Sequence, residues 1–290
     1  MASMNELIDG LRGLAALPQT VLRVTTMLTG GNASTAEIEH VARNDEALSL
    51  AILRRANSAR FGRPGCTFTL HESIARLGTS ALLKIVLEQK AAGMFADRGE
   101  AYGLQRGQLW RSAIGGAIAA ERVAQRANFG NPGLAFVCAL LRDVGKLAFD
   151  AHFGTRYMLL IEAHANSGRQ FVEMERSAFG FDHARLGAEL AMRWGLPQRI
   201  ADAIAFHHDP PTSPPAQDVL FDIVHAADII SLWAGLAIGC DGMQYKLANH
   251  VRVGLKLDRP AAEHIISEVW NKLRESEVKM APPARKGVAA

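Results

Sequence analysis

Apolar residues recur at helical spacing through most of the chain, and no run alternates apolar and polar positions for long enough to predict a β-strand. In the first hundred residues the periodic segments are short and turn residues separate them. They predict one helix that ends at Gly30, one capped by Ser34 with Glu37 in a capping box, one capped by Asp45, and two that span residues 70–77 and 80–95.

The segment 97–107 is polar, contains glycine and lacks apolar periodicity, so it is the predicted boundary between two helical halves. Pro132, Pro197 and Pro260 stand where proline can occupy the first turn of a helix. The helices predicted after the boundary cover residues 108–127, 132–152, 156–166, 170–178, 182–194, 197–208, 217–238 and 260–274. We therefore predict an all-α protein with an N-terminal helical subdomain (1–97), a second helical subdomain (98–280) and a flexible tail (281–290).

The composition is that of an ordinary globular protein. Of the 290 residues, 49% are hydrophobic and 21% are charged, which is enough apolar material for a sizeable core. The net charge is +3 and the pI is near 8.9, but Lys and Arg are scattered rather than clustered. A nucleic-acid surface is normally a basic patch or stripe, so this function is the weakest of those considered.

Cysteine usage and hydropathy indicate a cytoplasmic protein. Cys66, Cys138 and Cys240 lie far apart and form no Cys-x-x-Cys pair, which predicts neither a disulfide framework nor a structural zinc site. The first residues carry charges where a signal peptide would be apolar, and no apolar run reaches the length of a membrane helix. We expect a reducing cytosol and no membrane partner.

One charged residue falls among core positions of the predicted helix 132–152. Phe136, Leu140, Asp143 and Leu147 follow one another at helical spacing, so Asp143 shares a helix face with apolar neighbours. This predicts a buried carboxylate. Because desolvating a lone carboxylate is too costly for a folded protein, Asp143 must be paired, hydrogen-bonded or bound to a metal.

Other polar residues also fall at core-like positions of separate predicted helices, namely His183, His207, His208 and Asp228. A cluster of His and Asp from separate helices is a ligand set that divalent metals use. Any one histidine taken alone is more often a satisfied core or surface residue than a ligand. We assign four others to that class: His71, His164, His225 and His250.

Several short motifs accompany these residues. In the first half they are Leu17-Pro18-Gln19, Asn44-Asp45-Glu46-Ala47-Leu48, Arg55-Ala56-Asn57-Ser58 and Ala75-Arg76-Leu77-Gly78. In the second half they are Leu109-Trp110-Arg111, the run 139–146, Phe179-Gly180-Phe181-Asp182-His183-Ala184, Trp194-Gly195-Leu196-Pro197 and His207-His208-Asp209-Pro210. In this order the motifs resemble the HDOD family, a signalling-associated branch of the HD metal-phosphohydrolase superfamily. Residues 14–235 together are similar to one HDOD domain.

The resemblance implies a multi-helix HDOD architecture in which the second subdomain is HD-like. Active superfamily members bind metal through a first histidine, a His-Asp doublet and a later aspartate, with extra histidines in two-metal members. Here Arg142 stands in place of the doublet histidine, and Ser112 lies near the position of the first histidine. The retained positions form a vestigial pocket of Asp143, His183, His207, His208 and Asp228.

Arg142 can play one of two roles. In the first, its guanidinium replaces the positive charge of the ion and pairs with Asp143 or Asp228. Asp228 is then the favoured partner, because consecutive helix residues point about 100° apart. In the second, Arg142 faces solvent. Small residues around Ser112 favour close helix packing over an open cleft, and this stripe consists of Ser112, Gly115, Gly116 and Ala119.

A site short of two imidazoles should bind an ion poorly, and a guanidinium cannot ligate one. We therefore expect no catalytic residue, no cofactor and no metal, and a non-enzymatic regulatory protein of bacterial signal transduction that binds signalling proteins in trans. The alternative is a residual metal-dependent phosphohydrolase or phosphodiesterase that holds one divalent metal with the five pocket residues.

Two further functions have less support. The run Asp209-Pro210-Pro211-Thr212-Ser213-Pro214 lacks the Gly-Tyr-Pro motif of cyclic-di-GMP phosphodiesterases. The only feature that favours nucleic-acid binding is the pI.

Overall fold

The structure is a computed structural model that describes residues 3–10, 25–26, 34–57, 68–95, 97–154, 156–157, 159, 170–214, 216–236, 239 and 245–280. Within these ranges the chain forms helices and no strand, so the all-α prediction is confirmed. None of the described helices combines the length and the apolar character that crossing a bilayer requires.

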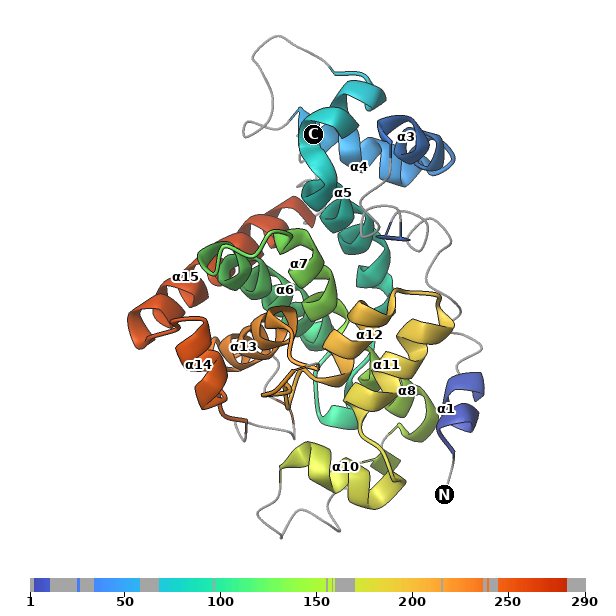
Figure 1. Ribbon diagram of the computed structural model, residues 1–290. Helices are drawn as coiled ribbons and strands as arrows, with labels where there is room; N and C mark the ends of the chain where they lie inside the picture. Colours follow the sequence, from blue (N-terminus) through green and yellow to red (C-terminus); the bar gives the residue numbers. More distant parts are fainter. Residues whose placement is uncertain are drawn as a thin grey trace, which may run out of the picture.

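The described helices are packed around α6, α7 and α13 (Figure 1). In chain order they are α1 (Met4–Gly10), α3 (Thr35–Arg43), α4 (Glu46–Ala56), α5 (Leu70–Phe95), the 3-10 helix η1 (Glu100–Tyr102), α6 (Gln108–Arg126), α7 (Pro132–Leu141), α8 (Val144–Phe153), α10 (Phe171–Phe179), α11 (His183–Arg193), α12 (Gln198–Ala205), α13 (Val219–Trp233), α14 (Asn249–Gly254) and α15 (Arg259–Met280).

Both capping predictions in the N-terminal half are confirmed. The Glu37 amide donates to Ser34 Oγ at 3.2 Å, and the Ser34 amide donates back to Glu37 Oε2 at 2.9 Å. At the next helix start, the Leu48 amide donates to Asp45 Oδ1 at 3.0 Å. These bonds satisfy amides that a helix start leaves unpaired, which is why short polar motifs specify where α3 and α4 begin.

Helix α5 connects the two halves of the molecule. Gly78, with φ 72° and ψ 167°, interrupts it between the two predicted helices 70–77 and 80–95. Glycine adopts this backbone geometry at little cost because it has no Cβ. Beyond the interruption, Lys84 forms an ion pair with Glu121 of α6, and its ammonium lies 5.1 Å from the ring centre of Phe136 on α7. The C-terminal part of α5 is therefore anchored on α6 and α7.

The predicted helix 132–152 is wrong in one respect, because it is broken at Arg142 and Asp143. Helix α7 ends at Leu141 and α8 begins at Val144, and Asp143 has φ −95° and ψ 12°, outside helical geometry. Consecutive residues of an unbroken helix point in different directions. The break allows the side chains of both Arg142 and Asp143 to reach the same site.

Other boundaries also differ from the prediction. The predicted helix 197–208 begins after Pro197, which is its N-cap, and ends at Ala205. The helix predicted for 217–238 ends at Trp233, and α14 was not predicted. The predicted helix 156–166, the helix that ends at Gly30 and the tail 281–290 lie wholly or largely outside the described residues.

The predicted boundary segment contributes to the core. Tyr102 of η1 is fully buried, although the segment 97–107 as a whole is polar. Helix α1 lies against α8 rather than against α3 and α4, and Arg193 Nη1 donates to Asp9 Oδ1 at 2.9 Å. The division into subdomains at residue 97 stays a prediction.

Candidate functional site

The five pocket residues predicted from the sequence meet where α8, α11, α12 and α13 converge. His183 is the first residue of α11, His207 and His208 follow the end of α12, Asp143 lies between α7 and α8, and Asp228 is within α13. Among their side chains, the most exposed is that of Asp228, at 7%. The structure thus gathers every residue of the predicted pocket in a buried position.

The alternative in which Arg142 faces solvent is wrong, because its side chain is only 1% exposed. Arg142 Nε donates to Asp228 Oδ1 at 2.6 Å and lies 3.3 Å from Asp143 Oδ2. The favoured ion pair with Asp228 is confirmed, and Asp143 also takes part. Coulombic attraction to Lys146 and Arg142 outweighs the effect of burial and holds the pKa of Asp143 well below its usual range.

Neutral oxygens satisfy the remaining guanidinium nitrogens. Arg142 Nη1 donates to the Ala139 carbonyl at 2.8 Å, and Nη2 donates to Ser112 Oγ at 2.9 Å and to Ser231 Oγ at 3.2 Å. Ser112, the residue near the expected first histidine, is thus a partner of Arg142. Each buried guanidinium nitrogen has a hydrogen-bond partner, which is the condition for burying a charge in a protein core.

Gly116 makes room for this arrangement. A Cβ at position 116 would lie 2.3 Å from Arg142 Nη1, closer than atoms can approach without displacement. The small residues on α6 were predicted to favour close helix packing; at Gly116 it is the Arg142 guanidinium that occupies the space a Cβ would fill.

A second close contact positions Asp143 beside the histidines. A Cβ at Gly145 would lie 1.9 Å from the His183 carbonyl, so only glycine allows α8 and α11 to approach this closely. As a result, Asp143 Oδ1 lies 3.6 Å from His183 Nε2. Oδ2 of the same carboxylate faces Arg142, so Asp143 joins the guanidinium to the histidine cluster.

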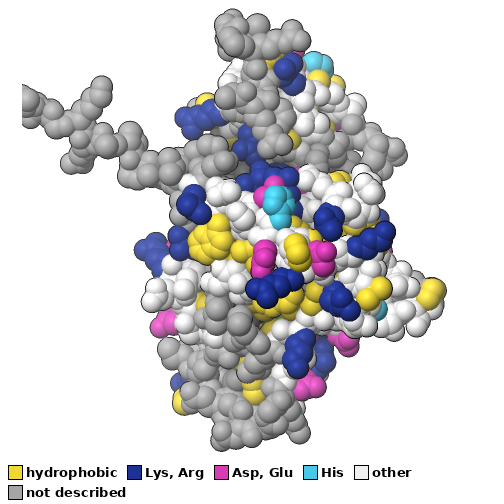
Figure 2. Space-filling model, turned by 90° about the vertical axis from the view of Figure 1, so that its left-hand side faces the viewer, with side chains coloured by type: hydrophobic (Ala, Val, Ile, Leu, Met, Phe, Trp, Pro, Cys, Tyr) yellow, Lys and Arg dark blue, Asp and Glu magenta, His cyan; other side chains and the backbone are white. Residues whose placement is uncertain are grey.

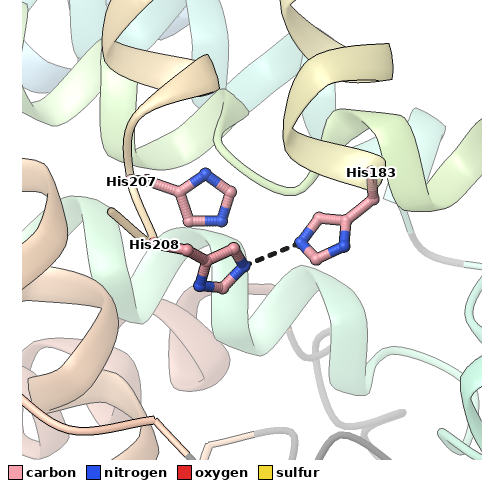
Figure 3. A group of neighbouring side chains, drawn as sticks. All are labelled: His183, His207 and His208. Atoms are coloured by element: carbon pink, nitrogen blue, oxygen red, sulfur yellow. Dashed lines mark hydrogen bonds between the residues drawn. The ribbon is translucent and has the colours of Figure 1, made fainter. Parts of the chain in front are cut away.

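The three histidines form a tight group (Figure 3). His183, His207 and His208 each offer a ring nitrogen, and these atoms lie within 4.8 Å of one another. His208 Nε2 is 2.9 Å from His183 Nε2. Among the described residues, His207 Nε2 is buried and has no hydrogen-bond partner.

Burial governs the protonation of this group. It lowers the pKa of His207 to about 4, and it lowers the pKa of His208, to which the neighbouring histidines also contribute. His183 differs. Burial lowers the pKa of His183 as well, but the charge and hydrogen bond of Glu175 outweigh this effect, so the net shift is upward. His207 and His208 are therefore neutral at pH 7.

Glu175 is a site residue that the sequence analysis missed. It is fully buried on α10 and accepts hydrogen bonds from His183 N at 2.8 Å and His183 Nδ1 at 2.7 Å. The hydroxyls of Tyr102 and Tyr157 donate to its other oxygen. Glu175 lies four residues after Phe171 and four before Phe179, so the apolar stripe that revealed Asp143 could also have revealed it.

Lys146 and Tyr245 also contact residues of the predicted pocket. Lys146 Nζ lies 2.9 Å from Asp143 Oδ1. The Tyr245 ring stacks on His208 with ring centres 4.3 Å apart and the planes at 19°. No signal in the sequence could have indicated Tyr245, because it lies 37 residues beyond His208 in a stretch without periodicity.

The four histidines that were predicted to be ordinary core or surface residues lie outside the pocket or outside the described residues. His225 is a satisfied core residue, since its Nδ1 donates to the His207 carbonyl at 2.8 Å and its Nε2 accepts from the Ala248 amide at 3.1 Å. His71 is an exposed residue that pairs with Glu39. His250 is partly exposed beside Asp222. His164 lies outside the described residues.

The superfamily resemblance implies a metal, and the residues fit only part of such a site. Asp228, one of the retained positions, is bound to Arg142, and the guanidinium prevents an ion from approaching there. The three imidazoles are donors that suit a transition metal, and the buried His207 Nε2 has no hydrogen-bond partner among the described residues.

Comparison with known proteins assigns the chain to a family. Residues 14–210 match the HDOD domain family. The chain belongs to the HDOD domain family. The match ends before α13, so Asp228 and Ser231 lie beyond it although both contact Arg142. The resemblance inferred from the motifs is confirmed.

Solved structures share this fold. An HDOD domain protein of unknown function from Geobacter sulfurreducens is 24% identical, with a TM-score of 0.68, and the similarity covers 95% of this chain and 94% of that one. A candidate signal transduction protein from Marinobacter aquaeolei is 20% identical, with a TM-score of 0.71, over 96% of this chain and 61% of that one. A candidate phosphohydrolase from Shewanella amazonensis is 21% identical, with a TM-score of 0.62, over 92% and 98% of the two chains.

An uncharacterised protein of Treponema pallidum is 25% identical over 224 residues, which are 76% of this chain and 42% of the relative. The chain therefore spans less than half of that relative.

Proposed function

We propose that this HDOD protein is a non-enzymatic regulatory protein that acts in signal transduction through contacts with signalling proteins. The observation that supports this proposal is the buried Arg142 guanidinium, bound to Asp228 and Asp143 at the metal-binding doublet of the superfamily. A guanidinium stays protonated and has no lone pair to offer, so it supplies charge without Lewis acidity.

Catalysis of phosphate hydrolysis needs an ion that polarises the phosphate and activates water. At the doublet, Arg142 neutralises the carboxylates instead, and Ser112 and Ser231 hold it in place. Displacing a hydrogen-bonded buried guanidinium would leave Asp228 without its main cationic partner and Asp143 with Lys146 alone, which is costly. The arrangement therefore supports a stable scaffold better than a reaction centre.

Access to the site favours the same proposal. The side chains of His183, His207 and Arg142 are at most 1% exposed, and Tyr245 covers His208. A phosphodiester would have to displace packed side chains to reach these residues. Binding in trans would then use the outer surface of the helical body.

Nucleic acid is not the favoured partner. On the face of the molecule that carries α14 and α15, Lys and Arg side chains lie among acidic and apolar ones rather than in one continuous patch (Figure 2). Such a mixed surface suits a protein partner better than a phosphate backbone.

A phosphodiesterase assay in added Mn²⁺ tests the proposal. The wild-type chain is compared with Asp143→Asn on bis(p-nitrophenyl) phosphate and on a cyclic dinucleotide. We expect no difference between the two proteins, because the wild type has no reaction for Asp143 to support. Turnover by the wild type that Asp143→Asn abolishes, with circular dichroism showing both proteins folded, would replace the proposal with its alternative.

That alternative is a residual metal-dependent phosphohydrolase. One observation favours it, namely the convergence of His183, His207 and His208 with ring nitrogens within 4.8 Å. Imidazoles and a carboxylate suit manganese, iron or zinc. A bound ion would supply Lewis acidity there, while His183, His207, His208 and Asp143 would hold it.

A positive test of signalling uses a defined partner. Proteins that co-purify with the tagged chain are expressed separately, and their affinity for the purified chain is measured. The activity of the partner is then measured with the wild-type chain and with Asp143→Asn. If both proteins change this activity equally, the site residue is not needed for chemistry, and the result supports a scaffold.

A further inference from the structure

A groove lies between the C-terminal end of α6 and the N-terminal end of α15, two helices that pack against each other (Figure 1). Its volume is about 400 Å³, within the range of about 300–1,000 Å³ that is usual for small-molecule sites. None of the described residues that line it belongs to the buried pocket around Arg142, and those of α15 lie beyond the family match. The groove is therefore a separate candidate site.

The α6 wall of the groove is rich in hydrogen-bond donors. Arg122 Nη1 donates to Gln125 Oε1 at 2.9 Å, and Arg122 Nε has no hydrogen-bond partner among the described residues. Arg126 Nη2 reaches the Lys256 carbonyl at 3.4 Å, which is longer than a well-formed N–H···O bond of about 2.7–3.2 Å. Because a guanidinium carries five N–H donors, this wall can donate to an added acceptor.

The charges of the groove are only partly paired. Arg122 and Arg126 are one helical turn apart, so the two cations lie on the same face of α6 and repel each other. Glu268 of α15 faces Arg122 with its Oε1 3.5 Å from Nε, and both side chains are partly exposed to solvent. Asp258 accepts a hydrogen bond from the Ala261 amide at 2.9 Å and so caps α15. Within the described structure, Arg126 has no carboxylate partner.

The α15 wall adds apolar surface. Pro260, Ala261 and Ile265 line the groove. Proline has no amide hydrogen, and the Ala261 amide is already bound to Asp258, so these residues offer the groove no free backbone donor. The start of α15 therefore contributes an apolar contact, and the cationic character of the groove comes from the arginines of α6.

A ligand that suits both walls has one negative charge and an apolar body. Guanidinium groups bind a planar carboxylate through paired N–H···O bonds, which are stronger than hydrogen bonds between neutral groups. Glu268 would repel a second negative charge, so a monoanion fits better than a phosphate dianion. Removing the apolar body from water against Ile265 and Pro260 would add to the affinity.

We propose that the groove between α6 and α15 binds a small organic monocarboxylate. Arg126 and Arg122 bind the carboxylate group, and the apolar residues at the start of α15 contact the rest of the molecule. The site involves none of the buried histidines, and the inference is independent of the proposed signalling function.

An NMR titration of the full-length chain at pH 8 and low ionic strength tests the proposal. The probes are benzoate, its neutral analogue benzamide, and phenyl phosphate, which is a dianion at this pH. We expect benzoate to bind saturably, with an affinity that falls as NaCl is added. Benzamide should bind about tenfold more weakly, because it lacks the charge-assisted hydrogen bonds. Absence of saturable benzoate binding, or equal or tighter binding of benzamide or phenyl phosphate, would overturn the proposal.

Two variants with opposite expected effects locate the ligand. Arg126→Gln removes the cation that has no carboxylate partner in the described structure, and we expect the affinity for benzoate to fall about tenfold. Glu268→Gln removes a negative charge from the groove, and the affinity should rise about three- to fivefold, the effect of one like charge at short range in water. A purely structural role of these residues would not change the affinity in opposite directions.

The matched control is Arg259→Gln. Arg259 also lies at the start of α15 and is highly exposed, but it pairs with Glu263 and does not line the groove. It removes the same charge as Arg126→Gln, so we expect unchanged affinity. Arg126→Lys keeps the charge without the planar fork and should restore part of the affinity. Equal weakening in the control, or unchanged affinity in folded Arg126→Gln, would contradict the assignment of the site.

Discussion

The buried site has a guanidinium end, at Arg142, and an imidazole end, at His183, His207 and His208, and the two ends satisfy their buried polar groups in different ways. At the guanidinium end, Arg142 binds Asp228 and Asp143, and Ser112, Ser231 and Ala139 satisfy its remaining nitrogens. At the imidazole end, His207 Nε2 has no partner among the described residues, and two ring nitrogens lie 2.9 Å apart. Every guanidinium nitrogen at the first end has a hydrogen-bond partner, whereas at the second end His207 Nε2 and His208 Nδ1 have none within the described ranges.

The difference follows the substitutions in the chain. Where the superfamily ligands are replaced, by Arg142 and near Ser112, the new side chains bond to each other and to retained Asp228. Where the superfamily positions are retained, ring nitrogens of the three imidazoles lie within 4.8 Å of one another.

The largest expected effect tests the guanidinium end. Arg142→Met keeps much of the apolar volume but leaves Asp228 without its main cationic partner and Asp143 with Lys146 alone. We expect the free energy of unfolding to fall by about 3–5 kcal/mol, because an uncompensated buried carboxylate is strongly destabilising. Urea denaturation followed by circular dichroism measures this change.

The matched control is Arg199→Met. Arg199 also forms two hydrogen bonds with an aspartate, Asp218, but its side chain is 49% exposed. Solvent screening limits such a pair to about 0–1 kcal/mol. If the two variants lost the same stability, burial would not distinguish these pairs, and the description of the guanidinium end as a buried structural network would be wrong.

An intermediate effect is expected for Gly116→Ala. The new methyl group would meet Arg142 Nη1 at 2.3 Å, so the guanidinium must move away from its hydrogen-bond partners. Overpacking of this kind costs about 1–3 kcal/mol. Gly93→Ala in α5 is the control, because Gly93 is exposed and a Cβ there meets nothing within 4 Å.

For Gly93→Ala we expect a gain of about 0.5–1 kcal/mol, since alanine loses less backbone entropy in a helix. If Gly116→Ala also stabilised the protein, the guanidinium would not lie against α6 in solution. In the Arg142→Met background the cost of Gly116→Ala should shrink, because contacting residues are not additive.

The smallest effect is expected at the imidazole end. His208→Phe keeps a planar ring between His207 and Tyr245, and it removes a side chain whose Nδ1 lacks a hydrogen bond within the described structure. The substitution also removes the partner of the buried His183 Nε2, and leaving one buried polar atom unpaired costs about 1–3 kcal/mol. We expect the free energy of unfolding of the metal-free protein to fall by about 1 kcal/mol, at the low end of this range, because Nδ1 of the same ring gives up no hydrogen bond. A loss comparable with that of Arg142→Met would mean that both ends are equally complete without an ion.

Local patterns predicted much of the fold. The capping box of Ser34 and Glu37, the cap Asp45 and the apolar periodicity of α6 involve residues within a few positions of one another, so the sequence alone locates these helices. The burial of Asp143 followed from the same kind of pattern. Glu175 carried an equivalent signal between Phe171 and Phe179 that was not used.

The breaks and contacts needed the folded molecule. Periodicity joined α7 to α8 because the apolar pattern continues through Arg142 and Asp143, whereas the backbone leaves helical geometry to direct both side chains at Asp228 and His183. The ends of α12 and α13 were also misplaced, since the last residues of a helix are set by tertiary contacts as much as by propensity.

The amino-acid sequence by itself determined that the chain is helical, that it carries the HDOD motifs, and that a carboxylate and several histidines have to be satisfied in its core. Only the tertiary structure decided how they are satisfied. The ion pair of Arg142 with Asp228 joins residues that are 86 positions apart in the chain, and it needs the space left by the absence of a Cβ at Gly116. Such contacts leave no periodic trace in the sequence, because their energies depend on distances that arise when the helices pack.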